Sequence, residues 1–330
     1  MNHNRVIVSP RIVAAAILLL VGSCAYADTV MRVREGDMSC DRACLNGFVD
    51  KYLDAMAAHD PSQLPLAKDV RMTENTVQMP LTDGLWFTTT AIGKNKHYIA
   101  DIYAQQAGAI AVVFEADGPK MLALRLRIKN MKINEIEMVT ARPGSSDPMG
   151  NNLPNWKPAA IWDRPLKPSE RMPRDQLAQV ANQYFEAIEK DDKSVVSYPS
   201  DCTMGQGREE NGSGSNVSDP KAPPAPPGME NMMKMPCAEM FGHGAMGGLS
   251  IPERSFWAVD DEMGAVLGAF IFSMDKPFVP KPGQTAMGGA VQQQPNSGII
   301  VEVFKIIDGK ICRQDGVTGM TYAYGTRTGW

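Results

Sequence analysis

Hydrophobic residues recur at helical spacing in two widely separated stretches of the chain. Between residues 41 and 58 the apolar positions on one face are Leu45, Phe48, Val49, Tyr52, Leu53 and Met56. Between residues 174 and 190 they are Leu177, Val180, Ala181, Tyr184, Phe185 and Ile188. Each pattern predicts an amphipathic helix that buries one face. His59-Asp60-Pro61 and Asp191-Asp192 end the two patterns.

After each helix the pattern changes to that of β-strands. In the first stretch we expect strands over residues 97–103, 109–115, 121–129 and 132–140, with Asp117-Gly118 and Asn130-Met131 as turns. In the second we expect strands over 255–259, 265–273, 298–307 and 310–315, with a hairpin turn at Asp308-Gly309. Each half is thus predicted to be a helix followed by a curved antiparallel sheet, and the fold class is α+β.

The two halves also resemble each other in sequence. Tyr52-Leu53-Asp54-Ala55-Met56 matches Tyr184-Phe185-Glu186-Ala187-Ile188, and the run 127–133 matches the run 305–311. This similarity predicts two tandem copies of one domain, over residues 40–142 and 174–330. The Pro-rich run 143–173 reads as a linker, and the Gly- and Pro-rich stretches near 212–250 and 276–298 are predicted to be disordered insertions.

The N-terminus predicts export. Arg5 and Arg11 precede an apolar run over residues 12–21, and Ala25-Tyr26-Ala27 supplies small residues for cleavage. Residues 1–27 therefore read as a signal peptide of a periplasmic or secreted protein. The apolar run is too short for a stable membrane span. An alternative is a lipoprotein anchored through Cys24.

Charge and cysteine content narrow the classes further. The net charge is −4 and there is no block of Lys or Arg, so nucleic acid is not expected as a partner. Removal of the signal peptide leaves five cysteines, and we expect a disulfide between Cys202 and Cys237. Cys40 and Cys44 are one helical turn apart, a spacing that allows a disulfide only with strain or at a frayed helix start. One thiol is left over.

The order of elements resembles the cone-shaped fold of the nuclear transport factor 2-like superfamily, which includes SnoaL-like cyclases and ketosteroid isomerase. The runs 40–45, 71–75 and 83–86 are similar to an uncharacterised SnoaL-like family of secreted proteins. The resemblance implies a funnel between helix and sheet that holds an apolar small molecule, and chemistry without a diffusible cofactor. It also implies two cones packed sheet against sheet as an internal pseudo-dimer.

Chemistry in such a cone needs an ionisable group shielded from water, because burial raises the pKa of a carboxyl toward neutrality. The catalytic candidates in the first copy are Asp83, His97, Tyr98 and Asp101; Glu74 and Tyr103 are also considered. The simpler alternatives are that Asp83 belongs to a turn before Gly84 and that His97 is an exposed strand residue.

Three groups of residues are candidates for binding. Arg71, Glu74 and Asn75 recur as Arg208, Glu210 and Asn211. This repeated triplet could lie at the mouth of the cone or could form a structural turn. Trp86 belongs to the motif that carries the resemblance. Arg254 and Trp257 lie beside Asp260-Asp261-Glu262, which we expect to form a solvated hairpin without a calcium site.

A Met-rich stretch offers a different hypothesis, copper binding. Its sulfur and imidazole donors are Met229, Met232, Met233, Met235, Cys237, Met240, His243 and Met246. Thioether, thiolate and imidazole suit Cu(I), although Met is abundant throughout the chain and Cys237 is expected in a disulfide. No metal site is therefore predicted.

Two functions remain. The first is an exported, cofactor-independent lyase, dehydratase or isomerase that acts on an apolar or aromatic small molecule by carboxylate acid–base chemistry. The second is an exported binding protein without catalytic activity. An ionisable pair within a cone would favour the enzyme, whereas a lining of aliphatic side chains alone would exclude it.

Overall fold

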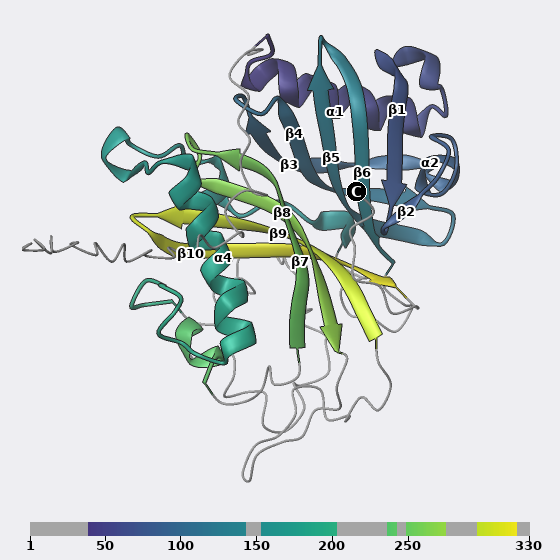
Figure 1. Ribbon diagram of the computed structural model, residues 1–330. Coiled ribbons are helices and arrows are strands. Elements are labelled where there is room, and N and C mark those ends of the chain that lie inside the picture. Colours follow the sequence, from purple (N-terminus) through teal and green to yellow (C-terminus); the bar gives the residue numbers. More distant parts are fainter. Residues whose placement is uncertain (1–38, 143–152, 203–235, 243–248, 275–295, 322–330) are drawn as a thin grey trace, which may run out of the picture. The chain divides into compact units, whose positions relative to one another are not determined.

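The computed structural model describes residues 39–142, 153–202, 236–242, 249–274 and 296–321, which all belong to one compact unit (Figure 1). Helices and strands are both present, in two separate sheets, as expected for an α+β fold. Each sheet is covered by one long helix, α1 in the first half and α4 in the second (Figure 1).

The first half contains one six-stranded sheet. Its elements are α1 (Arg42–Ala57), η1 (Pro61–Gln63), β1 (Leu66–Glu74), β2 (Val77–Gln78), α2 (Leu85–Thr88), β3 (Ala91–Asp101), β4 (Gln106–Glu115), β5 (Gly118–Lys129) and β6 (Lys132–Ala141). The strand order is β2-β1-β6-β5-β4-β3. The β1–β6 pair is parallel and the other pairs are antiparallel. Register shifts in β1, β3 and β5 mark bulges, which bend a sheet.

The second half contains a four-stranded antiparallel sheet. Its elements are η2 (Leu153–Asn155), η3 (Ala160–Asp163), η4 (Pro168–Glu170), α4 (Arg174–Lys190), η5 (Cys237–Met240), β7 (Leu249–Asp260), β8 (Ala265–Met274), β9 (Asn296–Ile307) and β10 (Lys310–Thr321). The strand order is β10-β9-β8-β7. The described part of the predicted linker, residues 153–173, is packed rather than free, because Leu153, Trp156, Trp162 and Leu166 are buried.

The predicted helices are found at nearly the predicted positions, whereas most strands are longer than expected. β3 begins six residues earlier than predicted, at Ala91, and β7 begins at Leu249 instead of Ser255. Within the stretch predicted as an insertion over 212–250, residues 236–242 are described and include η5. Four elements of the first half, η1, β1, β2 and α2, were not predicted.

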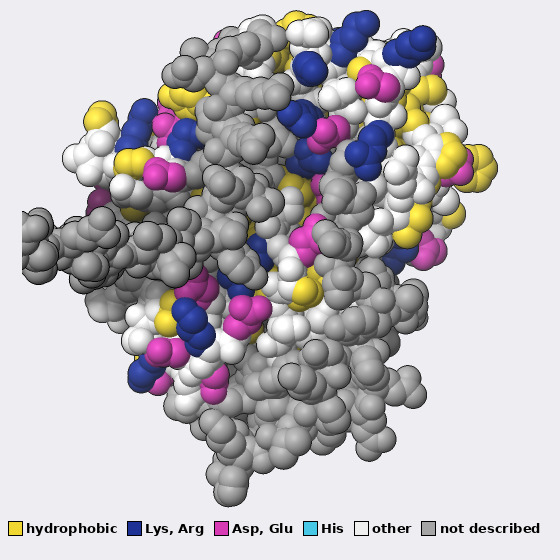
Figure 2. Space-filling view, in the orientation of Figure 1, with side chains coloured by type: hydrophobic (Ala, Val, Ile, Leu, Met, Phe, Trp, Pro, Cys, Tyr) yellow, Lys and Arg dark blue, Asp and Glu magenta, His cyan; other side chains and the backbone are white. Residues whose placement is uncertain are grey.

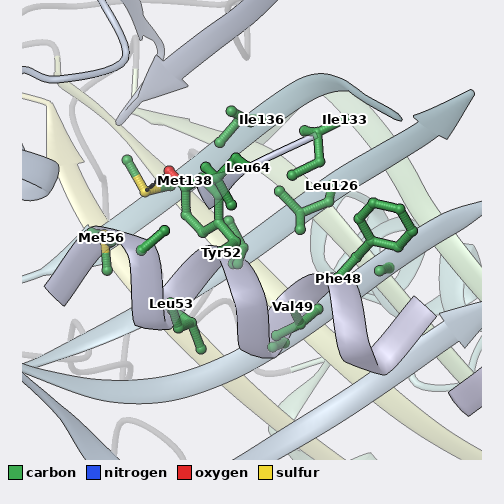
Figure 3. Close-up of a cluster of buried hydrophobic side chains, with 14 of the residues drawn as sticks. Phe48, Val49, Tyr52, Leu53, Met56, Leu64, Leu126, Ile133, Ile136 and Met138 are labelled. Carbon is green, nitrogen blue, oxygen red and sulfur yellow. Dashed lines mark hydrogen bonds between the residues drawn. The ribbon is translucent and has the colours of Figure 1, made fainter. Parts of the chain in front are cut away.

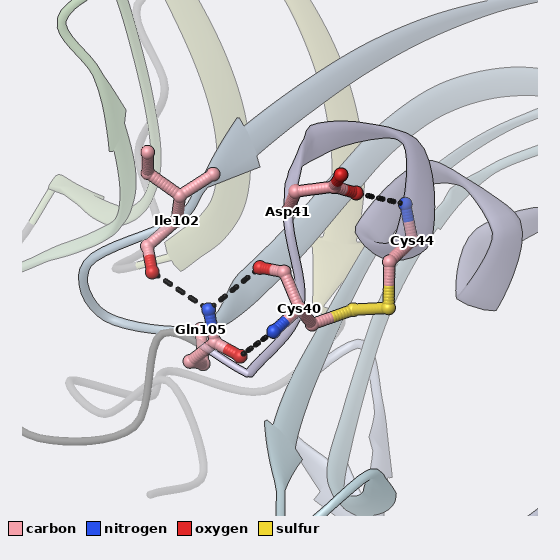
Figure 4. Close-up of a disulfide and its surroundings, with 5 residues drawn as sticks. All are labelled: Cys40, Asp41, Cys44, Ile102 and Gln105. Atoms are coloured by element: carbon pink, nitrogen blue, oxygen red, sulfur yellow. Dashed lines mark hydrogen bonds between the residues drawn. A yellow bond between two sulfur atoms is a disulfide. The ribbon is translucent and has the colours of Figure 1, made fainter.

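A disulfide lies at the start of α1. Asp41 is the N-cap, and its carboxylate accepts a hydrogen bond of 2.9 Å from the Cys44 backbone N–H. Cys40, just before the cap, is bonded to Cys44 with a Cα–Cα distance of 5.3 Å. The Gln105 side chain bonds both the N–H and the C=O of Cys40 (Figure 4). Cys40 precedes the first residue of α1, so this disulfide forms at a helix start, one of the two conditions under which the spacing permits it.

The core of the first half lies between α1 and the concave face of its sheet. Tyr52, Leu53 and Met56 of α1 meet Leu126, Met138 and their neighbours on β5 and β6 (Figure 3). The Tyr52 hydroxyl is 3.4 Å from the Met138 sulfur. Side chains fill this space, and nearly all of them are apolar.

A second core joins the other faces of the two sheets. It includes Ile99, Ile110 and Val139 from the first half, and Val301 and Val317 from the second, together with Trp156 and Trp162 from the linker. At the rim of this core two ion pairs repeat each other. Arg42, the first residue of α1, pairs with Asp260 at the end of β7. Arg174, the first residue of α4, pairs with Asp101 at the end of β3.

Candidate functional site

The structure separates the four catalytic candidates of the first half. Asp83 is exposed in a turn, with its N–H bonded to the Pro80 carbonyl. Tyr98 faces α1, where its hydroxyl donates a hydrogen bond of 2.6 Å to Asp50. Burial and the Asp50 carboxylate raise the pKa of Tyr98. Asp83 is thus a turn residue, as the simpler alternative stated. Tyr98 is held by Asp50 of α1.

His97 and Asp101 point to the opposite face of β3, toward the second half. The His97 ring lies 4.4 Å from the Trp162 ring, and burial lowers the pKa of His97 to about 3, aided by the charges of Lys305 and Arg313. His97 is buried, so the expectation of an exposed strand residue was wrong. Asp101 accepts hydrogen bonds from Arg174 and from the Val259 N–H. Both residues therefore contribute to the joint between the halves.

The repeated polar triplet has a structural role in the first half. Asn75 has a left-handed backbone, and its side chain bonds the N–H and C=O of Thr140. Glu74 is buried and accepts a 2.7 Å hydrogen bond from the Leu85 N–H, the first residue of α2. Arg71 is exposed. Arg208, Glu210 and Asn211 lie outside the described residues.

The binding candidates of the second half are also held by structural contacts. Arg254 pairs with Glu189 and donates to Asn182, which fixes β7 to α4. Trp257 is buried in the core between the sheets, with the Arg125 guanidinium 5.9 Å above its ring. Asp260 is buried and paired with Arg42, so the predicted solvated hairpin was wrong at this position.

A carboxyl group that was not predicted lies on β9, on the face that α4 covers. Phe304, two residues after Glu302, contacts Tyr184 and Phe185 of α4, and alternate strand residues share a face. Val301 and Val303 point the other way, into the core between the sheets. Glu302 therefore lies between helix and sheet, the place where the fold resemblance implies a ligand.

Glu302 has the electrostatics of an acid–base group. Only 7% of it is exposed, and burial raises its pKa to about 8, despite a hydrogen bond from Gln314 that favours the charged form. The Oε2 atom is buried without a hydrogen-bond partner. Burial raises the pKa of Tyr184 and Tyr198, and the negative charge of Glu302 adds to both shifts. Gln314 also bonds the Tyr184 side chain, so it links the two groups.

Aromatic rings surround this carboxyl group. We call Tyr184, Phe185, Phe241, Phe256, Phe270 and Phe304 the aromatic cluster. The centroids of contacting rings in this cluster lie 3.9–6.5 Å apart. Opposite Glu302 on both neighbouring strands is a glycine, Gly268 on β8 and Gly316 on β10. A Cβ at Gly268 would lie 2.6 Å from Phe270 Cζ, so this glycine admits the Phe270 ring beside the carboxyl group.

The second disulfide positions one side of the aromatic cluster. Cys202 and Cys237 are bonded with a Cα–Cα distance of 5.5 Å, as predicted. The short helix η5 starts at Cys237 and leads to Phe241, whose ring is 6.0 Å from that of Tyr184. Gly242 N–H bonds the Asp191 carboxylate at the end of α4. The disulfide thus holds Phe241 against the helix.

The two hairpins that end the halves have the same register, so their positions can be compared. In each hairpin the pair next to the turn is Lys129↔Lys132 in the first half and Ile307↔Lys310 in the second. One further pair lies between it and a bulge. Counting back from there, Glu302↔Gly316 takes the place of Leu124↔Met138. The first half therefore has two apolar side chains where the second has a carboxyl group and a glycine.

One sequence signal could have identified Glu302. Ile300, Glu302 and Phe304 occupy alternate positions on one face of a strand, and Glu302 is the charged residue on that face. A single carboxylate among apolar positions of one face indicates either an exposed edge or a buried functional group. This segment was predicted only as a strand, so the position of Glu302 on an apolar face was not considered.

Several other predictions concern partners. No helix of the described residues could span a membrane, and these residues contain no cluster of His, Cys, Asp and Glu that could hold a metal ion. The Met-rich copper candidate lies mostly outside the described residues, and Cys237 within it is oxidised and offers no thiolate. On the face drawn in Figure 2, Lys and Arg side chains are interspersed with Asp and Glu.

A family described as a domain of unknown function (DUF8021) matches residues 170–318, which include α4, β7–β9 and most of β10. No curated protein matches.

Similar solved structures include a putative ketosteroid isomerase from Kribbella flavida DSM 17836 (15% identity, 32% of this chain and 82% of that chain, TM-score 0.25). Others are a steroid delta-isomerase from Pseudomonas aeruginosa (14%, 32% and 84%, 0.24) and an uncharacterised protein with a cystatin-like fold from Silicibacter pomeroyi DSS-3 (16%, 29% and 74%, 0.23). TM-scores this low carry no argument about function.

Proposed function

We propose that this protein is an exported, cofactor-independent enzyme that moves protons on an uncharged, apolar or aromatic small molecule, and that its acid–base group is Glu302 in the second half. One observation carries this proposal. A carboxyl group with a pKa of about 8 and an unpartnered oxygen is buried beside aromatic side chains. Burying such a group costs stability, and groups of this kind cluster at functional sites.

The proposed chemistry follows from the protonation states. Near pH 8 about half of the Glu302 groups are ionised, so the carboxylate can take a proton from a carbon beside a carbonyl group. A hydroxyl group of Tyr184 or Tyr198 stays protonated and can donate to the oxyanion that forms. Return of the proton to another carbon gives isomerisation, and loss of hydroxide gives dehydration. Asp83, His97, Tyr98 and Asp101 have no part in this proposal.

We also propose that the halves are tandem copies paired as an internal pseudo-dimer. The reciprocal ion pairs support this, because Arg42 and Arg174 differ by the same 132 positions as the two helix motifs. The backbone contacts are reciprocal as well. Ala100 N–H donates to Asp260 and Val259 N–H donates to Asp101. Such mutual contacts are typical of a two-fold interface.

Export remains part of the proposal, with residues 1–27 as its signal peptide. The two disulfides are compatible with an oxidising compartment. N-terminal sequencing of the protein recovered from its host tests this, with a start at Asp28 expected and a lipidated Cys24 as the contrary result.

The enzyme is tested by proton exchange on an uncharged aromatic ketone, 2-tetralone, in D2O. Wild-type protein should accelerate exchange of the protons beside the carbonyl group, with a rate that rises with pH around an apparent pKa near 8. Glu302→Gln should lower the rate by about 10²–10⁴-fold. Wild-type exchange no faster than that of buffer would contradict catalysis on this class of ketone.

A second variant separates catalysis from binding. Glu302→Leu combined with Gly316→Met gives the second half the residue pair that the first half has. Native mass spectrometry of protein from its exporting host should reveal a co-purified small molecule on the wild type and none on the double variant. A ligand retained by the wild type without any proton exchange would favour the binding protein. Equal retention by both proteins would place the ligand elsewhere.

A further inference from the structure

A pocket separate from Glu302 lies in the first half, where α1 ends and α2 begins. Its volume is about 500 Å³, and its lining residues are His59, Thr82, Trp86 and Phe87. None of these four side chains carries a carboxylate or an ammonium or guanidinium group, so the pocket favours an uncharged occupant. Phe87 is 75% exposed, which leaves the face of its ring open to a ligand.

The pocket contains polar groups that can donate or accept hydrogen bonds. His59 Nδ1 is 2.9 Å from the Trp86 carbonyl oxygen. Because a carbonyl oxygen only accepts, Nδ1 donates in this contact, and Nε2 is the ring nitrogen that can accept from a ligand. The Trp86 ring is almost fully buried, and its Nε1–H has no hydrogen-bond partner. The Thr82 hydroxyl can donate or accept.

The lining is built on rigid elements. Glu74 binds the N-terminus of α2 and pairs with Arg142. Gly84 has a φ of 62°, and a Cβ there would lie 2.8 Å from the Met79 sulfur. Trp86 packs against the Tyr52 ring at 5.4 Å. The turn before α2 and the Trp86 side chain are therefore fixed before any ligand arrives, which lowers the entropic cost of binding.

We propose that this pocket is a second binding site, for a small planar aromatic molecule that carries an N–H or O–H donor, such as an indole or a phenol. The ring packs on Phe87, and its donor bonds His59 Nε2. The site is independent of Glu302 and does not rest on the activity proposed above.

The test is ¹⁹F NMR with 5-fluoroindole and with 5-fluoro-1-methylindole, which has the same ring without the donor. The mature protein should bind the first at least tenfold more tightly than the second. Phe87→Ala and His59→Lys should each weaken 5-fluoroindole about tenfold or more, since the first removes a wall and the second replaces the acceptor with a donor only. Circular dichroism checks that both variants are folded.

Glu302→Gln is the matched control, because it alters the other half alone. It should leave 5-fluoroindole binding unchanged. Binding that is lost in Glu302→Gln but retained in Phe87→Ala would show that the probe occupies the aromatic cluster instead. Absence of binding to the wild type, or equal binding of the two indoles, would also overturn the proposal.

Discussion

In the first half, Leu124 and Met138 fill the space between helix and sheet, whereas the same strand positions of the second half hold Glu302 and Gly316. Tyr52 of α1 meets the Met138 sulfur, while Tyr184 of α4 is linked through Gln314 to a carboxyl group. Both halves have a long helix that covers a sheet, and they differ in the residues that fill the space between helix and sheet. We infer that the first interior serves stability and the second bears a destabilising group that function requires.

The largest expected effect comes from placing a carboxyl group in the filled interior. Leu124 is fully buried, and Leu124→Glu should lower the free energy of unfolding by about 4–5 kcal/mol, because no partner awaits the new group. Urea denaturation at pH 8 measures it. Glu302→Leu is the matched variant and should be neutral or stabilising. A cost below about 2 kcal/mol for Leu124→Glu would mean that the two interiors are alike.

The next effect is the pH dependence that Glu302 imposes. Its folded pKa of about 8 lies above the ordinary value of 4.5, so between these values the folded chain keeps a proton that the unfolded chain releases. Stability is therefore fully present below pH 4.5 and falls as pH rises through about 8, by on the order of 4 kcal/mol. Glu302→Gln should remove most of this slope between pH 5 and 9. Buried Glu137, with a pKa of about 7, adds a smaller loss of stability of the same sign.

A third comparison sets the two disulfides against each other. Cys202–Cys237 spans 35 positions and Cys40–Cys44 spans 4. Loop-closure entropy predicts a loss of about 3–4 kcal/mol for replacing the first pair with Ser and about 2 kcal/mol for the second. Thermal unfolding measures both. Only the first replacement should also weaken ligand retention, because it frees Phe241, and equal ligand loss in both would contradict this role.

The last comparison concerns the ion pairs between the two halves. Asp101→Asn weakens the partner of Arg174, and Asp260→Asn weakens the partner of Arg42. The two arginines have equivalent positions in the two halves. We expect each to cost about 2–3 kcal/mol, and the two costs to be similar if the contacts are truly reciprocal. Chemical denaturation of both single variants gives the comparison. A large effect of one and none of the other would argue against the pseudo-dimer.

The sequence predicted the local features of this fold better than the distant ones. Both long helices follow from apolar periodicity, and Cys202–Cys237 from the position of the two cysteines. β1 was missed because the run 66–74 does not alternate clearly and its partner β6 lies about 60 residues away. Strand alternation showed that His97 and Tyr98 point to opposite faces of β3. It could not show that a second sheet covers the His97 face.

The same limit explains the site. Asp101 is a reasonable acid–base candidate in a single cone, but its partners Arg174 and Val259 are more than 70 positions away. Glu302 was missed for a different reason, because a single charged residue on the apolar face of a strand belongs to no recognisable sequence motif. Its meaning depends on the Tyr184 and Phe270 side chains that surround it. Those come from α4 and β8, and only the folded chain brings them together.

The apolar core between the sheets has a consequence for cooperativity. Because Ile99, Ile110 and Val139 are buried by Val301 and Val317, neither half retains its native environment once the other unfolds. The chain is therefore expected to melt in a single calorimetric transition, although its sequence divides near residues 143–173. Residues 170–318 expressed alone would present this face to water and would tend to self-associate, with the first half acting as a built-in solubilising partner.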